Sequence, residues 1–198
     1  MNFFKIFLFI TFSFLLSFHS VAIIIPDSII TKCNTAKDIQ ILSANEKNVI
    51  FLTNIVRCYP KFFLDSFLVS YMDSAKTNKK TKYYKSLIID LNNGKPLKPL
   101  IFDEKLYSFA FSHAKDMGKH GLVGHNSSNG DYRPLGLIGE NCSYGYEKPI
   151  DILFQLLLDE GVPSLGHREN ILEPSYKTIG VSIFKHKKYK WNCVMDFS

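Results

Sequence analysis

The sequence lacks the short motifs by which several common enzyme classes are recognised. It contains no His-Glu-x-x-His pattern, no Gly-x-Ser-x-Gly turn and no phosphate-binding loop. It also contains no internal repeat and no low-complexity tract. These absences leave zinc peptidases of the common type, serine hydrolases and P-loop nucleotide-binding proteins without support. A function must therefore be argued from ionisable residues that are dispersed along the chain.

Cysteine is scarce, with four residues among 198, and none of them forms a Cys-x-x-Cys pair. A cysteine zinc site or a dithiol redox motif is therefore not expected. An even count fits two disulfides in an oxidising compartment, for which three connectivities exist. We favour Cys33 with Cys58 and Cys142 with Cys193, because each bond would tie an end of the domain to an inner element. Free buried thiols are the alternative, but we expect no cysteine to remain free as a nucleophile.

The charge is unbalanced, with a net value of +6 that comes mostly from lysine. The lysines gather in two runs, at residues 76–85 and 185–190. Such runs predict solvated faces or an exposed hairpin, with weak attraction to anionic surfaces at most. No motif supports nucleic-acid binding.

The chain begins with a segment that is typical of a secretory signal peptide. One lysine precedes a nearly uninterrupted apolar run at residues 6–18, and Ser20-Val21-Ala22 supplies the small residues that a signal peptidase needs. We therefore expect residues 1–22 to be removed and the mature chain to be secreted. The alternative is a retained membrane anchor, since residues 6–25 approach the roughly 20 residues that a bilayer requires.

The rest of the chain predicts one domain of helices that ends in a β-hairpin. Its length suits a single domain, because domains cluster near ~100 to 200 residues. We expect an N-terminal extension at residues 23–45 and the domain proper at 46–198. The local signals are a helix capped by Asn45 and divided at Pro60, a helix capped by Asp103, a helix that starts at Pro149, and a hairpin of residues 178–184 and 189–194.

Ionisable residues in the glycine-rich second half form the candidate site. His125 and Glu140 each follow a glycine, and His167 comes after a turn that begins with Asp159 and Glu160. Two imidazoles and two carboxylates can hold a divalent metal such as zinc with a coordination position left for water. Alternatively, an acid can orient a histidine that then transfers protons. We interpret His113 and His120, on the preceding helix, as structural or exposed.

These residues and their neighbours, taken in order, resemble the CAP superfamily, also called SCP-like or cysteine-rich secretory, antigen 5 and pathogenesis-related 1. The similarity spans residues 46–197 and is closest to single-domain forms from bacteria and other microbes. The residues that carry it are Asn54 with Arg57 and Pro60, His113-Ala114-Lys115-Asp116-Met117, Gly124-His125, Gly139-Glu140-Asn141 and Gly166-His167-Arg168-Glu169-Asn170-Ile171-Leu172.

The resemblance implies an α+β fold, a three-layer α-β-α sandwich with a central cleft lined by two histidines and two acids. Position by position these are His125, Glu140 and His167, with Asp159, or alternatively Glu160, as the second acid. Two departures stand out. Leu156 replaces a tryptophan found in many members. The insertion at residues 159–164 makes the alignment with the family ambiguous just before Gly166.

The family's members are mostly secreted and have varied activities. Some bind divalent metals in the cleft, some bind sterols or other lipids, and protease activity is claimed for a few. By resemblance we expect a secreted, non-catalytic binding or effector module whose cleft takes a divalent metal (zinc, or calcium or magnesium), a sterol or other lipid-like ligand, or another extracellular ligand. The alternative is a metal-assisted hydrolase, a peptidase or esterase, that uses the same four residues. A third interpretation gives the cleft residues a structural role only.

Overall fold

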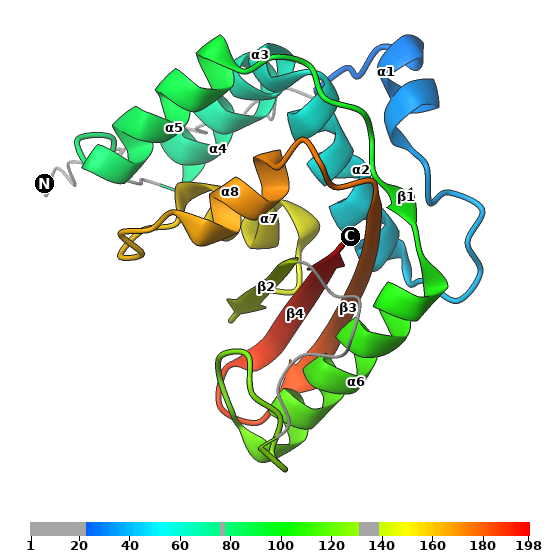
Figure 1. Cartoon of the computed structure of the whole chain (residues 1–198). Helices are drawn as coiled ribbons and strands as arrows, with labels where there is room; N and C mark the ends of the chain where they lie inside the picture. The colour runs from blue at the N-terminus through cyan, green and yellow to red at the C-terminus, as the bar shows by residue number, and fades with distance from the viewer. Residues whose placement is uncertain (1–22, 76–77, 131–138) are drawn as a thin grey trace, which may run out of the picture.

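The computed structural model describes residues 23–75, 78–130 and 139–198 (Figure 1). The predicted signal peptide lies outside these residues, as do all but the last three residues of the membrane anchor that is its alternative. Within the described ranges no helix is both long and apolar enough to cross a bilayer.

Helices precede and flank a small sheet. The helical elements are α1 (Asp27–Cys33), α2 (Ala44–Cys58), α3 (Pro60–Phe63), the π-helical turn η1 (Leu64–Leu68), α4 (Val69–Ser74), α5 (Lys82–Asn93), α6 (Glu104–His120), α7 (Pro149–Leu158) and α8 (Gly166–Leu172). The strands are β1 (Ile101–Phe102), β2 (Gly139–Tyr144), β3 (Thr178–His186) and β4 (Lys190–Phe197).

The four strands form one sheet in the order β1-β3-β4-β2. The short β1 runs parallel to β3, while β3 with β4 and β4 with β2 are antiparallel. Helix α6 covers one face of the sheet, and α2 with α7 and α8 lies on the other (Figure 1). The fold is therefore the predicted α+β, three-layer α-β-α sandwich.

Strand alternation divides the sheet's side chains between two apolar clusters. Cys142 and Val194, which are paired across β2 and β4, pack with Ala110, Ala114 and Met117 of α6. The neighbouring residue Cys193 belongs to the larger cluster on the opposite face. Residues of β2 can therefore reach either the α6 layer or the α7 and α8 layer.

Most local signals for helix ends are found where they were expected. Asp103 caps α6 by accepting the backbone N–H of Leu106 at 2.9 Å, and Pro149 is the first residue of α7. Pro60 separates α2 from α3. The N-cap of α2 is a correction: Ser43, not Asn45, forms a capping box with Glu46. Ser43 prevails because it can exchange two hydrogen bonds with Glu46, a residue three positions ahead.

The segment at residues 23–45 contributes to the same core as the rest of the chain. Ile29, Cys33, Ala36 and Leu42 are buried in the larger cluster. Asn54 of α2 fixes this segment, because its side-chain amide donates to the Cys33 carbonyl at 3.1 Å and to Thr35 Oγ1 at 3.0 Å. The predicted boundaries between leader, extension and domain stay predictions.

The four cysteines are free thiols, and one predicted disulfide is wrong. In the register of β2 and β4, Cys142 pairs with Val194, so Cys142 and Cys193 point to opposite faces of the sheet. A bond between them would need their Cβ vectors to converge, which this register forbids. Cys33 and Cys58, by contrast, share a side-chain hydrogen bond.

Candidate functional site

A cavity of about 690 Å³ opens beside β2, α7 and the turn before α8. Its polar lining includes His125, Asp159, Glu160 and His167. Its apolar lining comes from α4, β2, α7 and the turns that follow β2 and α7. It includes Tyr71, Met72, Tyr144, Tyr146, Phe154, Leu156, Leu158 and Val162. The cavity therefore combines a cluster of imidazoles and acids with a large apolar wall.

His125 lies against Glu140 at one side of this cavity. The ring Nδ1 of His125 and Oε1 of Glu140 are 2.6 Å apart. The Glu140 side chain is 5% exposed, whereas that of His125 is 38% exposed. A neutral ring that donates from Nδ1 keeps its lone pair at Nε2. The buried carboxylate thus fixes the ring and leaves its second nitrogen available as a ligand or base.

His167 and Asp159 repeat this arrangement. His167 Nδ1 is 2.6 Å from Asp159 Oδ1, and the Asp159 side chain is 1% exposed against 26% for the histidine. His167 lies in the first turn of α8 and not in a loop. Asp159 adopts a left-handed conformation, φ 55°, directly after α7. This conformation turns the chain so that the carboxylate faces the start of α8.

The second acid beside a histidine is Asp159. Glu160 also lines the cavity, but the hydrogen bond to the imidazole of His167 comes from its neighbour. Acids at the C-terminal end of a helix oppose the helix dipole and therefore need a partner. That partner is His167 together with the first backbone N–H groups of α8. The role of His125, Glu140, Asp159 and His167 as metal ligands stays a prediction.

Two asparagines connect the pairs across the sheet edge. Asn141 Nδ2 donates to the backbone carbonyl of His167 at 2.9 Å. Asn170 Nδ2 donates to the backbone carbonyl of Glu140 at 3.3 Å and to Asn141 Oδ1 at 2.8 Å. These bonds hold β2 against α8, and so hold the two imidazole-carboxylate pairs in a fixed relationship.

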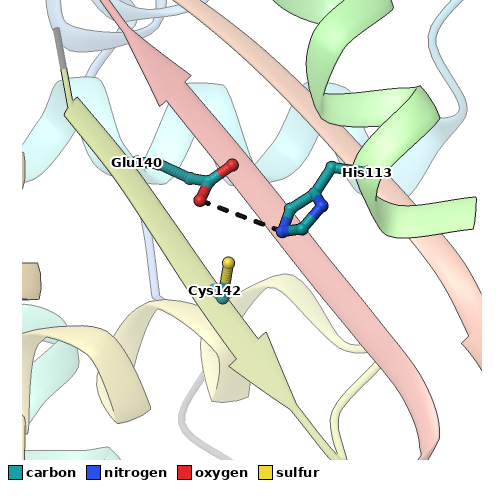
Figure 2. Close-up of side chains that lie close together, drawn as sticks. All are labelled: His113, Glu140 and Cys142. Atoms are coloured by element: carbon teal, nitrogen blue, oxygen red, sulfur yellow. Dashed lines mark ion pairs between the residues drawn. The ribbon is translucent and has the colours of Figure 1, made fainter. Parts of the chain in front are cut away.

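Two residues near Glu140 were not recognised as site residues from the sequence. His113 of α6 and Cys142 of β2 are both buried and close to the Glu140 carboxylate (Figure 2). Cys142 also lines the cavity, as a free thiol. Burial and the Glu140 carboxylate raise the pKa of the Cys142 thiol well above its usual value. The signal that could have found it is Glu-x-Cys alternation along a strand.

Three residues singled out from the sequence have structural contacts. His113 Nε2 is 3.1 Å from the Gly124 carbonyl, as expected of a packed helix histidine. His120 is exposed at the end of α6, where Nδ1 is 3.0 Å from Asp116 Oδ1. Arg168 points away from the cavity, fully buried, and donates to the Leu157 and Leu158 carbonyls and to Asp90.

A model of the cysteine-rich secretory protein (CAP) family matches residues 52–197. This match covers well over half of the sequence and confirms the resemblance, so the chain belongs to the CAP family.

Comparisons with individual proteins add little to this assignment. No curated protein matches the chain. Among solved structures, an extracellular protein containing an SCP domain, from Bacillus anthracis str. Ames, is 22% identical with a TM-score of 0.41, over 58% of this chain and 38% of that one. An outer surface protein from Borrelia burgdorferi is 21% identical with a TM-score of 0.41, over 58% of this chain and 86% of that one. The chain thus spans well under half of the Bacillus protein.

Proposed function

We propose that this CAP chain is a non-catalytic binding module whose cavity holds a divalent metal ion through Nε2 of His125 and Nε2 of His167. One observation carries the proposal: two imidazoles that line the same cavity each have Nδ1 2.6 Å from a buried carboxylate. Histidines that ligate metals usually donate their other ring nitrogen to such a carboxylate, which fixes the ring and raises its basicity.

The donor set favours zinc over calcium or magnesium. Imidazole nitrogen suits zinc and other late transition metals, whereas calcium and magnesium prefer sets of oxygen ligands. The carboxylates of Glu140 and Asp159 are each occupied by a histidine, so the donor that each pair leaves for an ion is an imidazole nitrogen. Such a site would leave coordination positions for water or for a ligand group.

Export of the mature chain is part of the proposal. It is supported by the apolar run at residues 6–18, followed by Ser20-Val21-Ala22. Mass spectrometry of chain recovered from the medium of an expressing host tests it. We expect an N-terminus near residue 23, and an intact N-terminus in the membrane fraction would support the anchored alternative.

The apolar wall favours a second ligand class, a lipid-like molecule. Tyr71, Phe154 and Leu156 line the same cavity as the two histidines. Cavities that bind small molecules combine mostly apolar walls with a few convergent polar groups. A sterol or fatty acid whose polar head faces the histidines fits this description. Binding of a radiolabelled sterol or fatty acid, lost on Leu156→Arg, tests this class.

Metal-assisted hydrolysis by the same four residues is the enzyme alternative. An imidazole paired with a carboxylate can accept a proton from water, which would make His125 or His167 a general base. Turnover of peptide or ester libraries that stops on addition of a chelator would favour this alternative. We expect no such turnover from the wild-type chain.

Calorimetric titration with Zn²⁺ tests the proposal. The samples are the wild type, the double variant His125→Ala/His167→Ala and the control variant His120→Ala, whose ring lies outside the cavity. We expect wild type and control to bind alike, and the double variant to lose the cavity ion while it keeps its circular dichroism spectrum. Equal binding by all three would overturn the proposal. If the wild type binds no zinc and the double variant differs from it only in a lower melting temperature, the structural interpretation is supported.

A further inference from the structure

Glu140 and Cys142 lie two residues apart on β2, so both side chains face the layer occupied by α6. His113 comes from the α6 surface that packs on this face. Figure 2 shows the imidazole directed at the Glu140 carboxylate, with the Cys142 sulfur beside both. All three residues are buried, with exposed fractions of 8%, 5% and 7% for His113, Glu140 and Cys142. The sandwich thus brings an imidazole, a carboxylate and a thiol together inside the protein.

The spacing of the three donor atoms is close to that of a metal site. His113 Nε2 and Glu140 Oε1 are 3.9 Å apart, and the donor atoms of all three residues lie within 4.8 Å of one another. Around a tetrahedral zinc ion, nitrogen and oxygen ligands are about 3.3 Å apart. The His113 and Glu140 donors would therefore approach by roughly half an ångström, which side-chain rotation can provide.

We propose that His113, Glu140 and Cys142 form a second, inner metal site that binds a zinc-like divalent ion with a thiolate ligand. On binding, Cys142 loses its thiol proton to solvent and Sγ coordinates the ion. The His113 Nε2 proton moves to Nδ1 through solvent, so that the Nε2 lone pair replaces the contact with the Gly124 carbonyl. Glu140 contributes one carboxylate oxygen. One proton is released for each ion bound, and the remaining coordination position takes water.

The cavity gives an ion a route to this site. Cys142 contributes to the cavity lining, and its Sγ is 4.0 Å from His125 Nδ1. A soft thiolate selects zinc, cobalt or cadmium and disfavours calcium and magnesium. Both His125 and His113 face Oε1 of Glu140, and since a carboxylate oxygen has two lone pairs, Glu140 can ligate the inner ion and still hold His125. The inner site therefore does not depend on whether the cavity histidines bind an ion of their own.

A structural role for the same residues is the competing explanation. His113 Nε2 and Cys142 Sγ both contact the Gly124 carbonyl, at 3.1 and 3.5 Å, and so hold the backbone just before His125. If this is their only role, substitution will lower the melting temperature without any effect on metal binding. An experiment must therefore detect the sulfur-metal bond itself.

Cobalt(II) titration followed by absorption spectroscopy makes this distinction, because a thiolate bound to cobalt gives an intense near-ultraviolet charge-transfer band. The sample is the full chain in a phosphine reductant. We expect a saturable band that is displaced by Zn²⁺. Cys142→Ser and Cys142→Ala should abolish the band. Loss of a residue that only supports a metal ligand lowers metal affinity by roughly 10- to 100-fold. Loss of the ligand itself in His113→Gln should therefore weaken cobalt affinity by at least that much.

Two variants serve as controls. Cys193→Ser removes a buried thiol from the opposite face of the sheet and should keep the band. His167→Ala removes a ligand of the proposed cavity site and should also keep the cobalt band. The band therefore tests the inner site even if the cavity histidines bind no ion. Absence of the band in the wild type, or its persistence in both Cys142 variants, would overturn the inner site. Thermal unfolding of each variant without metal shows whether it is folded.

Discussion

Asp159 bonds His167 twice, through its ring and through its backbone. Oδ1 is 2.6 Å from the ring Nδ1, and Oδ2 accepts the backbone N–H of His167 at 3.0 Å. One carboxylate thereby fixes the orientation of the imidazole and satisfies a free N–H at the start of α8. The same residue ends α7, so the geometry of the histidine depends on how two helices meet.

The Asp159→Asn variant should separate these two roles. Asparagine still caps a helix N-terminus, so stability should change by no more than about 1 kcal/mol. It cannot hold the ring as a carboxylate does, because its amide favours the opposite tautomer of His167. We expect zinc affinity in the cavity to fall by roughly 10- to 100-fold, measured by calorimetry alongside urea unfolding.

The neighbouring variant Glu160→Gln is the matched control. Glu160 is exposed and lines the cavity, but the hydrogen bond to His167 belongs to Asp159. Zinc affinity should therefore stay within about twofold of wild type, since an exposed charge contributes little. A larger loss in Glu160→Gln than in Asp159→Asn would reverse our assignment of the second acid.

Oxidation should join Cys33 to Cys58. Their shared hydrogen bond lowers the pKa of Cys58 and raises that of Cys33, so Cys58 supplies the thiolate for exchange with oxidised glutathione. The new bond would close a loop of about 25 residues and stabilise the fold by about 3.5 kcal/mol in the chain-entropy model. Peptide mapping after acid quenching and alkylation should recover a peptide linked through Cys33 and Cys58.

The same map tests the correction made for the other pair. Cys142 and Cys193 face opposite sides of the sheet, so both should be recovered as alkylated monomers after unfolding. A peptide that links Cys142 to Cys193 would contradict the register of β2 and β4.

Gly180 lies at a close approach between α6 and β3. A Cβ atom there would be 2.1 Å from the Tyr107 backbone nitrogen and 2.2 Å from the Leu106 carbonyl carbon. Because backbone atoms cannot rotate away, Gly180→Ala must move α6 off the sheet. We expect a loss of about 3 kcal/mol or more, at the upper end for overpacked cores, measured by urea unfolding.

Gly166→Ala is the control for that experiment. The nearest atom to its Cβ would be Ser164 Oγ at 3.5 Å, an ordinary contact, and the residue begins α8 without a positive φ. Its stability should equal that of the wild type or rise slightly, because alanine favours a helix. Equal losses at both positions would mean that α6 does not pack on β3 as described.

Local chemistry made much of this fold predictable. Helix ends and the hairpin could be predicted because each depends on residues close together in the sequence. Examples are the cap Asp103, the first helical residue Pro149 and the lysine turn at residues 187–189. The cap of α2 was predicted wrongly as Asn45, because Ser43 and Asn45 are both residue types that cap helices and only the reciprocal bond of Ser43 with Glu46 separates them.

The site was predictable in its residues more than in its arrangement. The family resemblance supplied His125, Glu140 and His167. The spacing of residues does not reveal that Asp159, and not Glu160, turns toward the imidazole ring of His167. That depends on a left-handed residue at the end of α7. Cys142 was missed because no strand was predicted at the start of β2. Once the strand is known, its alternation with Glu140 places the thiol at the site.

Anomalous diffraction from a zinc-soaked crystal, recorded on both sides of the zinc absorption edge, tests the central claim most directly. The account predicts a peak in the cavity about 2.0 to 2.1 Å from both Nε2 of His125 and Nε2 of His167. A cavity without any anomalous peak, with both Nε2 atoms bonded only to water, would contradict it.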